Sequence, residues 1–172
     1  LGFESILIKQ YLEAGRVEIV TLPFLNKQTI ILTTRIMEQI RVNIEWYDHN
    51  FGASLGDNVP GAVVLTAKTY DELMKEIPET LRFHVEGMVA DGDDVPQWLR
   101  DGDYTFDYHL DTAALIRSCE QYASLAAISR ASGVNERQLS HYANGIKKAR
   151  AQQRERIVEG LHEIGRRLIA VV

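Results

Sequence analysis

Near its carboxyl end the chain reads Gly133-Val-Asn-Glu-Arg-Gln-Leu-Ser-His-Tyr-Ala-Asn-Gly145, and this stretch predicts a short helix with both ends marked. Gly133 suits the left-handed residue that ends a preceding helix. Asn135 is a strong N-cap, and Gln138 stands three residues later, where a capping-box partner belongs. Gly145 then ends the helix.

The two faces of this predicted helix differ in character. Leu139 and Tyr142 are its large apolar residues, and they are three positions apart and therefore on one face. The side chains left pointing outward are those of Glu136, Arg137, Gln138, Ser140 and His141. A short helix with a thin core face and an outer face of hydrogen-bonding side chains is suited to contact a partner.

A second short helix is predicted just upstream, over residues 125–132, with Ser124 as its cap. Its core positions would be Ala127, Ile128 and Ala131, which are small enough for a neighbouring helix to approach closely. Two short helices joined by a tight glycine turn form a helix-turn-helix, whose second helix enters the DNA major groove. The alternative is a helical hairpin that only packs against the rest of the chain.

Residues 128–145 resemble the Xre/Cro-type helix-turn-helix family in their spacing, in the Asn-Gly ending and in the basic patch that follows. The resemblance implies binding to double-stranded operator DNA. Glu136, Arg137 and His141 would face base edges. The basic patch would contact phosphates. The complete set of DNA-binding residues that we expect is Asn135, Glu136, Arg137, Gln138, Ser140, His141, Asn144, Lys147, Lys148 and Arg150.

Charge divides the 172-residue chain into unlike parts. Residues 37–110 carry 15 acidic and 5 basic side chains, a net charge of −10. Residues 111–172 carry 6 acidic and 10 basic side chains, a net charge of +4, and residues 1–36 add +1. An acidic part followed by a basic part indicates two modules with partners of opposite kinds.

The single cysteine, Cys119, excludes an intramolecular disulfide and is typical of a protein in a reducing compartment. No apolar run approaches the roughly 18 residues that a membrane span needs. The sequence therefore predicts a cytoplasmic protein with no membrane partner, associated with the nucleoid when it is bound to DNA.

Residues 1–36 form an uncertain amino-terminal extension, and the chain begins at Leu1. Apolar residues between positions 3 and 12 could line a helix, and residues 17–20 and 29–32 could be strands. A predicted strand starts directly after Met37. We expect the native protein to begin there, with the extension being translated upstream sequence. The alternative is a real extra strand or helix that packs on the next domain.

An alternating strand pattern begins at Glu38. Ile40, Val42, Ile44 and Trp46 alternate with polar residues, the period of a strand with one buried face. Turn residues then separate further strands, which we place at residues 51–55, 62–66 and, after a helix, 104–110.

That helix is predicted between the third and fourth strands. Thr69 and Glu72 form a capping box. An apolar stripe recurs every four residues from Leu73 to Val85, and Gly87 is expected to end the helix. The order is strand, strand, strand, helix, strand, followed by an all-helical region. The fold class is α+β.

This order, together with Asn58-Val-Pro-Gly61 and Lys68-Thr-Tyr-Asp-Glu-Leu73, resembles the antitoxins of the HicB family. The join at residues 104–111 resembles the family too, and the whole resemblance covers residues 37–172. Family members carry a small, partial ribonuclease-H-like sheet followed by a DNA-binding module, which in a subset is an Xre-type helix-turn-helix. The resemblance implies a toxin-binding domain at 37–110 and a DNA-binding domain at 111–172.

By this resemblance the protein is an antitoxin of a type II toxin-antitoxin module. It would neutralise a small basic, messenger-RNA-cleaving toxin of the HicA type and repress the operon that they share. We expect a homodimer or a higher even oligomer. The competing interpretation is a plain Xre-family repressor whose amino-terminal domain senses a ligand or dimerises.

A third interpretation, a nuclease-like enzyme, finds little support. The acidic cluster from Asp91 to Asp103 lies between glycines and a proline and is typical of a solvated loop; it lacks the spacing of a calcium loop. Glu45 and Asp107 alternate with apolar strand residues and so point outward. The histidines have no metal-ligand spacing, and no Ser-His-Asp arrangement or phosphate loop is present. The sequence predicts no enzyme, metal or cofactor.

Asp111 caps a predicted helix at the start of the basic region, and a long helix ends the chain. Its apolar residues, Ile157, Leu161, Ile164 and Leu168, are spaced four and three apart. Such a stripe could be a dimer seam, and we expect it to be helix core.

Overall fold

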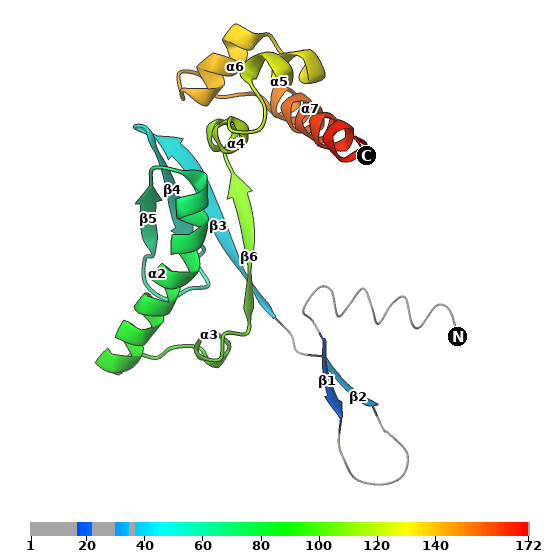
Figure 1. Cartoon of the computed structure of the whole chain (residues 1–172). Coiled ribbons are helices and arrows are strands. Elements are labelled where there is room, and N and C mark those ends of the chain that lie inside the picture. The colour runs from blue at the N-terminus through cyan, green and yellow to red at the C-terminus, as the bar shows by residue number, and fades with distance from the viewer. Residues whose placement is uncertain (1–16, 22–29, 35–36, 172) are drawn as a thin grey trace.

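Figure 1 shows the computed structural model of the chain, which describes residues 17–21, 30–34 and 37–171. Within these ranges the protein is α+β, with a four-stranded mixed sheet, a two-stranded sheet and six helices. The predicted class and the order of strands and helix after residue 37 are confirmed. The elements are β1 (Val17–Thr21), β2 (Ile30–Thr34), β3 (Glu38–Tyr47), β4 (Asn50–Leu55), β5 (Val64–Ala67), α2 (Tyr70–Asp91), α3 (Gln97–Arg100), β6 (Tyr104–Leu110), α4 (Thr112–Cys119), α5 (Leu125–Ser132), α6 (Glu136–Ala143) and α7 (Ala151–Ile169).

The two predicted strands of the amino-terminal extension are present. β1 and β2 pair in antiparallel register, with Val17 opposite Thr34, and form a two-stranded sheet separate from the larger one. The helix considered between positions 3 and 12 lies outside the described residues.

The larger sheet has the order β5-β4-β3-β6. β3 pairs antiparallel with β4 through the turn residues Asp48 and His49, which both have positive φ, 47° and 63°. Two such residues make the type of tight turn whose twist matches that of a hairpin. β3 also pairs in parallel with β6, which returns after α2 and α3. The predicted alternation of β3 holds, because Ile40, Val42 and Ile44 are fully buried.

Helix α2 covers one face of this sheet (Figure 1). Its amino terminus is the predicted capping box: Thr69 Oγ1 accepts from the Glu72 amide at 3.2 Å, and Glu72 accepts from the Thr69 amide at 3.1 Å. Leu73, Ile77 and Leu81 are fully buried against the strands. The stripe thus closes the core of the sheet module, which we define as residues 38–110.

Two predicted boundaries in this module are wrong, and one short helix was not predicted. Helix α2 continues through Gly87 and ends at Gly92, which is the residue in left-handed conformation, at φ 80°. A glycine ends a helix only where it adopts that conformation, and Gly87 does not. The third strand begins at Val64 rather than at position 62, after Gly61 turns the chain at φ 79°. The predicted acidic loop also contains the short helix α3.

Helix α4 connects the sheet module to the remaining helices (Figure 1). Asp111 caps it as predicted, by accepting from the Ala114 amide at 2.6 Å, and the Asp111 amide donates to Ile44 O at 2.8 Å. Ala114 belongs to the core under the sheet, and Ile116, two residues later, belongs to the core of the helical region. α4 therefore takes part in both cores.

The second core lies among α4, α5, α6 and α7, which together form the helical module. Ile116, Ile128, Leu139 and Ile157 are fully buried there. The small residue that lets a helix approach α5 was misassigned from the sequence. Ala127 and Ala131 are half-buried, whereas Ser132 is buried against Gly160 of α7.

Helix α7 packs against that core from Ile157 to Ile164 but not at its carboxyl end. Ile157 is fully buried, and Leu161 and Ile164 are half-buried. Leu168 is 62% exposed and Ile169 81% exposed, so the expectation that the whole stripe is core is wrong at its carboxyl end. In Figure 1 this end of α7 extends beyond the helices on which its first half packs.

Candidate nucleic-acid interface

The turn between α5 and α6 has the conformation that its glycine predicts. Gly133 adopts φ 66° and its amide donates to Ser129 O at 2.8 Å, which ends α5. Val134 is 2% exposed and anchors the turn in the helical core. Asn135 then caps α6, because its Oδ1 accepts from the Arg137 amide at 3.0 Å. Both predicted ends of the turn are confirmed.

The predicted capping box of α6 does not form. Gln138 donates its side-chain amide to the Tyr142 hydroxyl at 2.6 Å instead of reaching back to Asn135. The two side chains lie four residues apart on the same side of the helix, where such pairs meet readily. Tyr142 is buried, so this contact draws Gln138 toward the core and leaves it half-buried.

We define the outer face of α6 as the side chains of Glu136, Arg137, Ser140 and His141. The solvent exposure of these side chains decreases along the helix. Glu136 and Arg137 in the first turn are exposed, and Ser140 and His141 are half-buried. Within the described part of the chain, the side chains of Glu136 and Arg137 make no hydrogen bond or ion pair. The first turn of α6 therefore presents one carboxylate and one guanidinium, both unpaired, to a partner.

Asn144, which the sequence also places among the DNA-binding residues, is already engaged within the protein. Its Nδ2 donates to the Ser140 carbonyl oxygen at 2.8 Å, and its Oδ1 accepts from Arg117 Nη2 at 2.5 Å. Arg117 was not predicted as a site residue. Its partners at the end of α6, Ala143 and Asn144, are 26 and 27 residues away, and no local pattern in the sequence connects them to it.

A basic turn follows α6. Gly145 adopts φ 68° after the last helical residue, as its position predicts. Lys147, Lys148 and Arg150 then lie exposed before α7 begins, without an ion pair among the described residues. Their charges are therefore available to an anionic partner.

Two further arginines of α7 hold backbone oxygens rather than carboxylates. Arg154 donates to Leu110 O at 2.7 Å, at the end of β6, and to the Thr112 hydroxyl at 3.3 Å. Arg156 donates to Gly133 O at 2.9 Å, at the turn before α6. Sequence reasoning missed both. They fix the position of α7, and neither forms an ion pair with an acidic side chain in the part of the chain that the structure describes.

The sheet module has a different surface. Between β5 and α2 lies a hollow of about 410 Å³ whose lining includes Val64 and Phe83, which are 68% and 77% exposed. Asp91 and Asp93 line the same hollow and are exposed. Large apolar side chains and carboxylates thus lie together on the acidic part of the chain.

No group of three or more His, Cys, Asp or Glu in the described residues could hold a metal ion. Glu45 and Asp107 are exposed on the sheet face away from α2, as predicted, and Asp107 pairs with His109 at 2.6 Å. None of the helices in those residues is long and apolar enough to span a membrane.

Comparison with known proteins gave no match of any kind. No protein-family profile matches the chain, and no curated protein or solved structure matches it.

Proposed function

We propose that the protein is a two-module antitoxin and transcriptional repressor. The helical module binds double-stranded operator DNA through α5 and α6, a helix-turn-helix of the Xre/Cro type. The sheet module binds and neutralises a small basic toxin of the HicA type. The observation that carries the proposal is the unpaired first turn of α6, with Glu136 and Arg137 exposed, followed by the exposed Lys147, Lys148 and Arg150.

The geometry of α6 suits entry into a major groove. Its first turn presents Glu136 and Arg137, and the amino-terminal residues of a recognition helix are the ones that reach base edges. Arg137 can donate two hydrogen bonds to guanine, and Glu136 can accept from the amine of cytosine. Each such contact discriminates against the wrong base by about 1–3 kcal/mol.

The distribution of charge supports the same assignment. The chain has a net charge of −5, yet residues 111–172 carry 10 basic side chains against 6 acidic ones. DNA phosphates would repel a protein whose whole surface is negative. In this chain the basic side chains are concentrated beside the exposed face of α6, where they would attract DNA phosphates instead. Contacts from Lys147, Lys148 and Arg150 to phosphates would supply affinity and orientation without reading sequence.

The sheet module supplies the toxin-binding half of the proposal. Its order of elements and its mixed sheet are compatible with the partial ribonuclease-H-like domain of HicB antitoxins. It holds 15 acidic side chains, which would accelerate encounter with a basic toxin. Phe83 and Val64 beside the carboxylates Asp91 and Asp93 offer apolar anchors with an acidic border, a combination common at protein interfaces.

A homodimer completes the proposal. Helix-turn-helix proteins bind paired half-sites as dimers. At the carboxyl end of α7, Leu168 and Ile169 are 62% and 81% exposed, and Val171, just after the helix, is 83% exposed. Leu168 continues the stripe that begins with the buried Ile157, and a second copy of α7 would cover these exposed side chains.

The test of DNA recognition compares two variants on two duplexes. The operator probe is the DNA upstream of the protein's own gene, and the control is a scrambled duplex of equal length. Arg137→Ala should weaken operator binding by about 1–3 kcal/mol and leave scrambled DNA nearly unaffected, since it removes a base contact. Lys148→Ala should weaken both duplexes alike and lower the salt slope by about 1. Equal losses on both duplexes for Arg137→Ala would refute the proposed docking of α6.

A further inference from the structure

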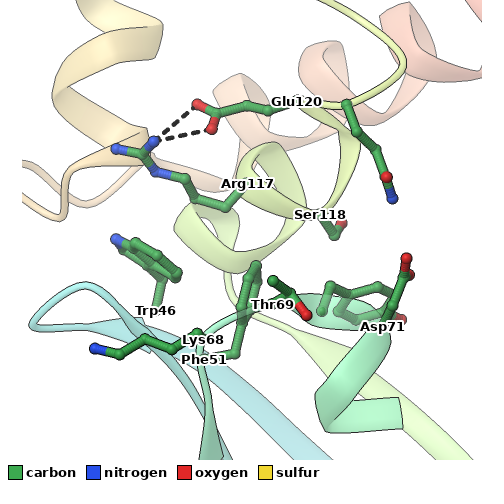
Figure 2. Close-up of a pocket in the computed structure, with 10 residues that line it drawn as sticks. Trp46, Phe51, Lys68, Thr69, Asp71, Arg117, Ser118 and Glu120 are labelled. Carbon is green, nitrogen blue, oxygen red and sulfur yellow. Dashed lines mark hydrogen bonds and ion pairs between the residues drawn. The ribbon is translucent and has the colours of Figure 1, made fainter. Parts of the chain in front are cut away.

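The two modules meet at a hollow of about 300 Å³, shown in Figure 2. Trp46 at the end of β3 and Phe51 of β4 form one wall of the hollow. Their rings pack edge to face, with ring centres 4.8 Å apart. Residues 68–71, around the start of α2, complete the lining together with four residues around the end of α4: Arg117, Ser118, Glu120 and Gln121. Arg117 extends from α4 over the Trp46 ring.

Arg117 contacts four groups from three parts of the chain. Its Cζ lies 5.1 Å from the centre of the Trp46 ring, in the sheet module. Its Nη1 donates to both carboxylate oxygens of Glu120, at 3.1 and 2.9 Å. Its Nε donates to the Ala143 carbonyl oxygen at 3.1 Å, and its Nη2 donates to Asn144 Oδ1 at 2.5 Å. The last two groups lie at the carboxyl end of α6.

We propose that Arg117 is a positioning residue for DNA recognition, and that Trp46 makes the operator affinity of α6 depend on the sheet module. The inference rests on the proposed function of α6. Arg117 holds the last turn of α6 directly through the Ala143 carbonyl, and indirectly through Asn144, which in turn bonds to Ser140. The orientation of the outer face is thereby fixed relative to Trp46.

A guanidinium is needed for this set of contacts. Its flat face lies over an aromatic ring while its edge donates in several fixed directions, and a lysine ammonium cannot reproduce that geometry. The Ala143 carbonyl is among the last oxygens of a helix, which lack partners within the helix itself. Losing Arg117 would therefore free the end of α6 and release the Asn144 side chain.

Arg117 is poorly suited to contact DNA itself. Its side chain is 22% exposed, and Glu120 pairs with its charge at 2.9 Å. A residue that positions a reading helix should affect discrimination between sequences. A residue that touches phosphates should instead affect all sequences and change the salt dependence. The two roles can therefore be separated by measurement.

The experiment measures equilibrium binding of the full chain to the operator duplex and to the scrambled duplex at several salt concentrations. Arg117→Met should weaken operator binding about tenfold, the effect of losing charge-assisted hydrogen bonds that hold the helix. Arg117→Lys should not rescue it. Binding to scrambled DNA and the salt slope should stay unchanged. Arg82→Met, which removes an exposed arginine from α2, is the matched control and should bind like the wild type.

Variants of Trp46, alone and combined with Arg117→Met, test whether the sheet module acts through Arg117. Trp46→Leu should weaken operator binding about threefold, the range of an exposed cation–π contact, and Trp46→Phe should retain most of it. In the Arg117→Met background Trp46→Leu should have no further effect on operator binding, although it should lower thermal stability in both backgrounds. Additive losses in the double variant, or wild-type operator binding by Arg117→Met, would overturn the inference. Failure of the wild type to prefer the operator would instead overturn the proposed function of α6.

Discussion

Replacing Gly160 of α7 by alanine tests the packing that supports the α5–α6 pair. A methyl group built at Gly160 would lie 2.8 Å from both Cβ and N of Ser132 and 2.9 Å from its Cα. Two of these atoms are backbone, so the contact cannot be relieved by rotating a side chain. Overpacking of this kind costs about 1–3 kcal/mol, and the higher helix propensity of alanine offsets up to about 1 kcal/mol. We expect a net loss of about 1–2 kcal/mol.

Gly165 provides the matched control in the same helix, because a methyl group there would meet nothing within 4 Å. Gly165→Ala should therefore stabilise the protein by up to about 1 kcal/mol through helix propensity alone. The assay is urea unfolding followed by the helical circular dichroism signal. With a slope of about 1–3 kcal/mol per molar, Gly160→Ala should lower the midpoint by roughly 0.3–2 molar, and Gly165→Ala should raise it. Similar stabilisation by both variants would show that α5 and α7 are not in backbone contact.

Three further outcomes are expected. A chain beginning at Met37 should melt within a few degrees of the full chain and bind DNA equally, because β1 and β2 form their own sheet; a larger fall would mean that the extension is part of a core. Leu168→Glu should stay folded, since Leu168 is 62% exposed, but the variant should be a monomer with half the dimer mass in light scattering. An unchanged dimer mass would exclude a dimer contact through the carboxyl end of α7. Hydrogen bonds from Arg167 and Arg166 lower the pKa of Glu163, so its contribution to stability exists above the usual glutamate range and is lost as pH falls through its lowered pKa. Glu163→Gln should therefore melt lower than the wild type at about pH 7, and this difference should shrink as pH falls below the usual glutamate range; a difference that stays constant in acid would contradict this.

Much of the local structure could be predicted from the sequence because it depends on residues that are close together in the chain. The alternation of Ile40, Val42 and Ile44 predicts a strand with one buried face, and Thr69 with Glu72 predicts the start of α2. Gly133 and Asn135 likewise predict the turn that precedes α6. In each case the residue acts through its own backbone conformation or through partners within a few positions.

The remaining features depend on contacts between distant segments. Whether Gly87 or Gly92 ends α2 is decided by which of them adopts a left-handed conformation, and composition alone cannot distinguish them. The burial of Ser132 depends on Gly160 of another helix, and the role of Arg117 depends on partners in both modules. For the same reason no pattern in the sequence indicates that Ala114 of α4 belongs to the core under the sheet.

The outer face of α6 allows the most direct test of the two-module proposal. Glu136, Arg137 and His141 would be replaced together by alanine in the full chain, and the variant would be expressed beside the small protein encoded by the neighbouring gene, with a reporter under the shared promoter. Phe83→Ser is the reciprocal variant, because Phe83 is 77% exposed on the sheet module.

Growth and reporter activity are measured in the same cells. The triple variant should restore growth as the wild type does while losing repression, because its substitutions lie on the helical module and leave the acidic surface intact. Phe83→Ser should repress normally and restore growth less well. Failure of the triple variant to restore growth, although it is folded and as abundant as the wild type, would contradict the assignment of toxin capture and DNA binding to separate modules.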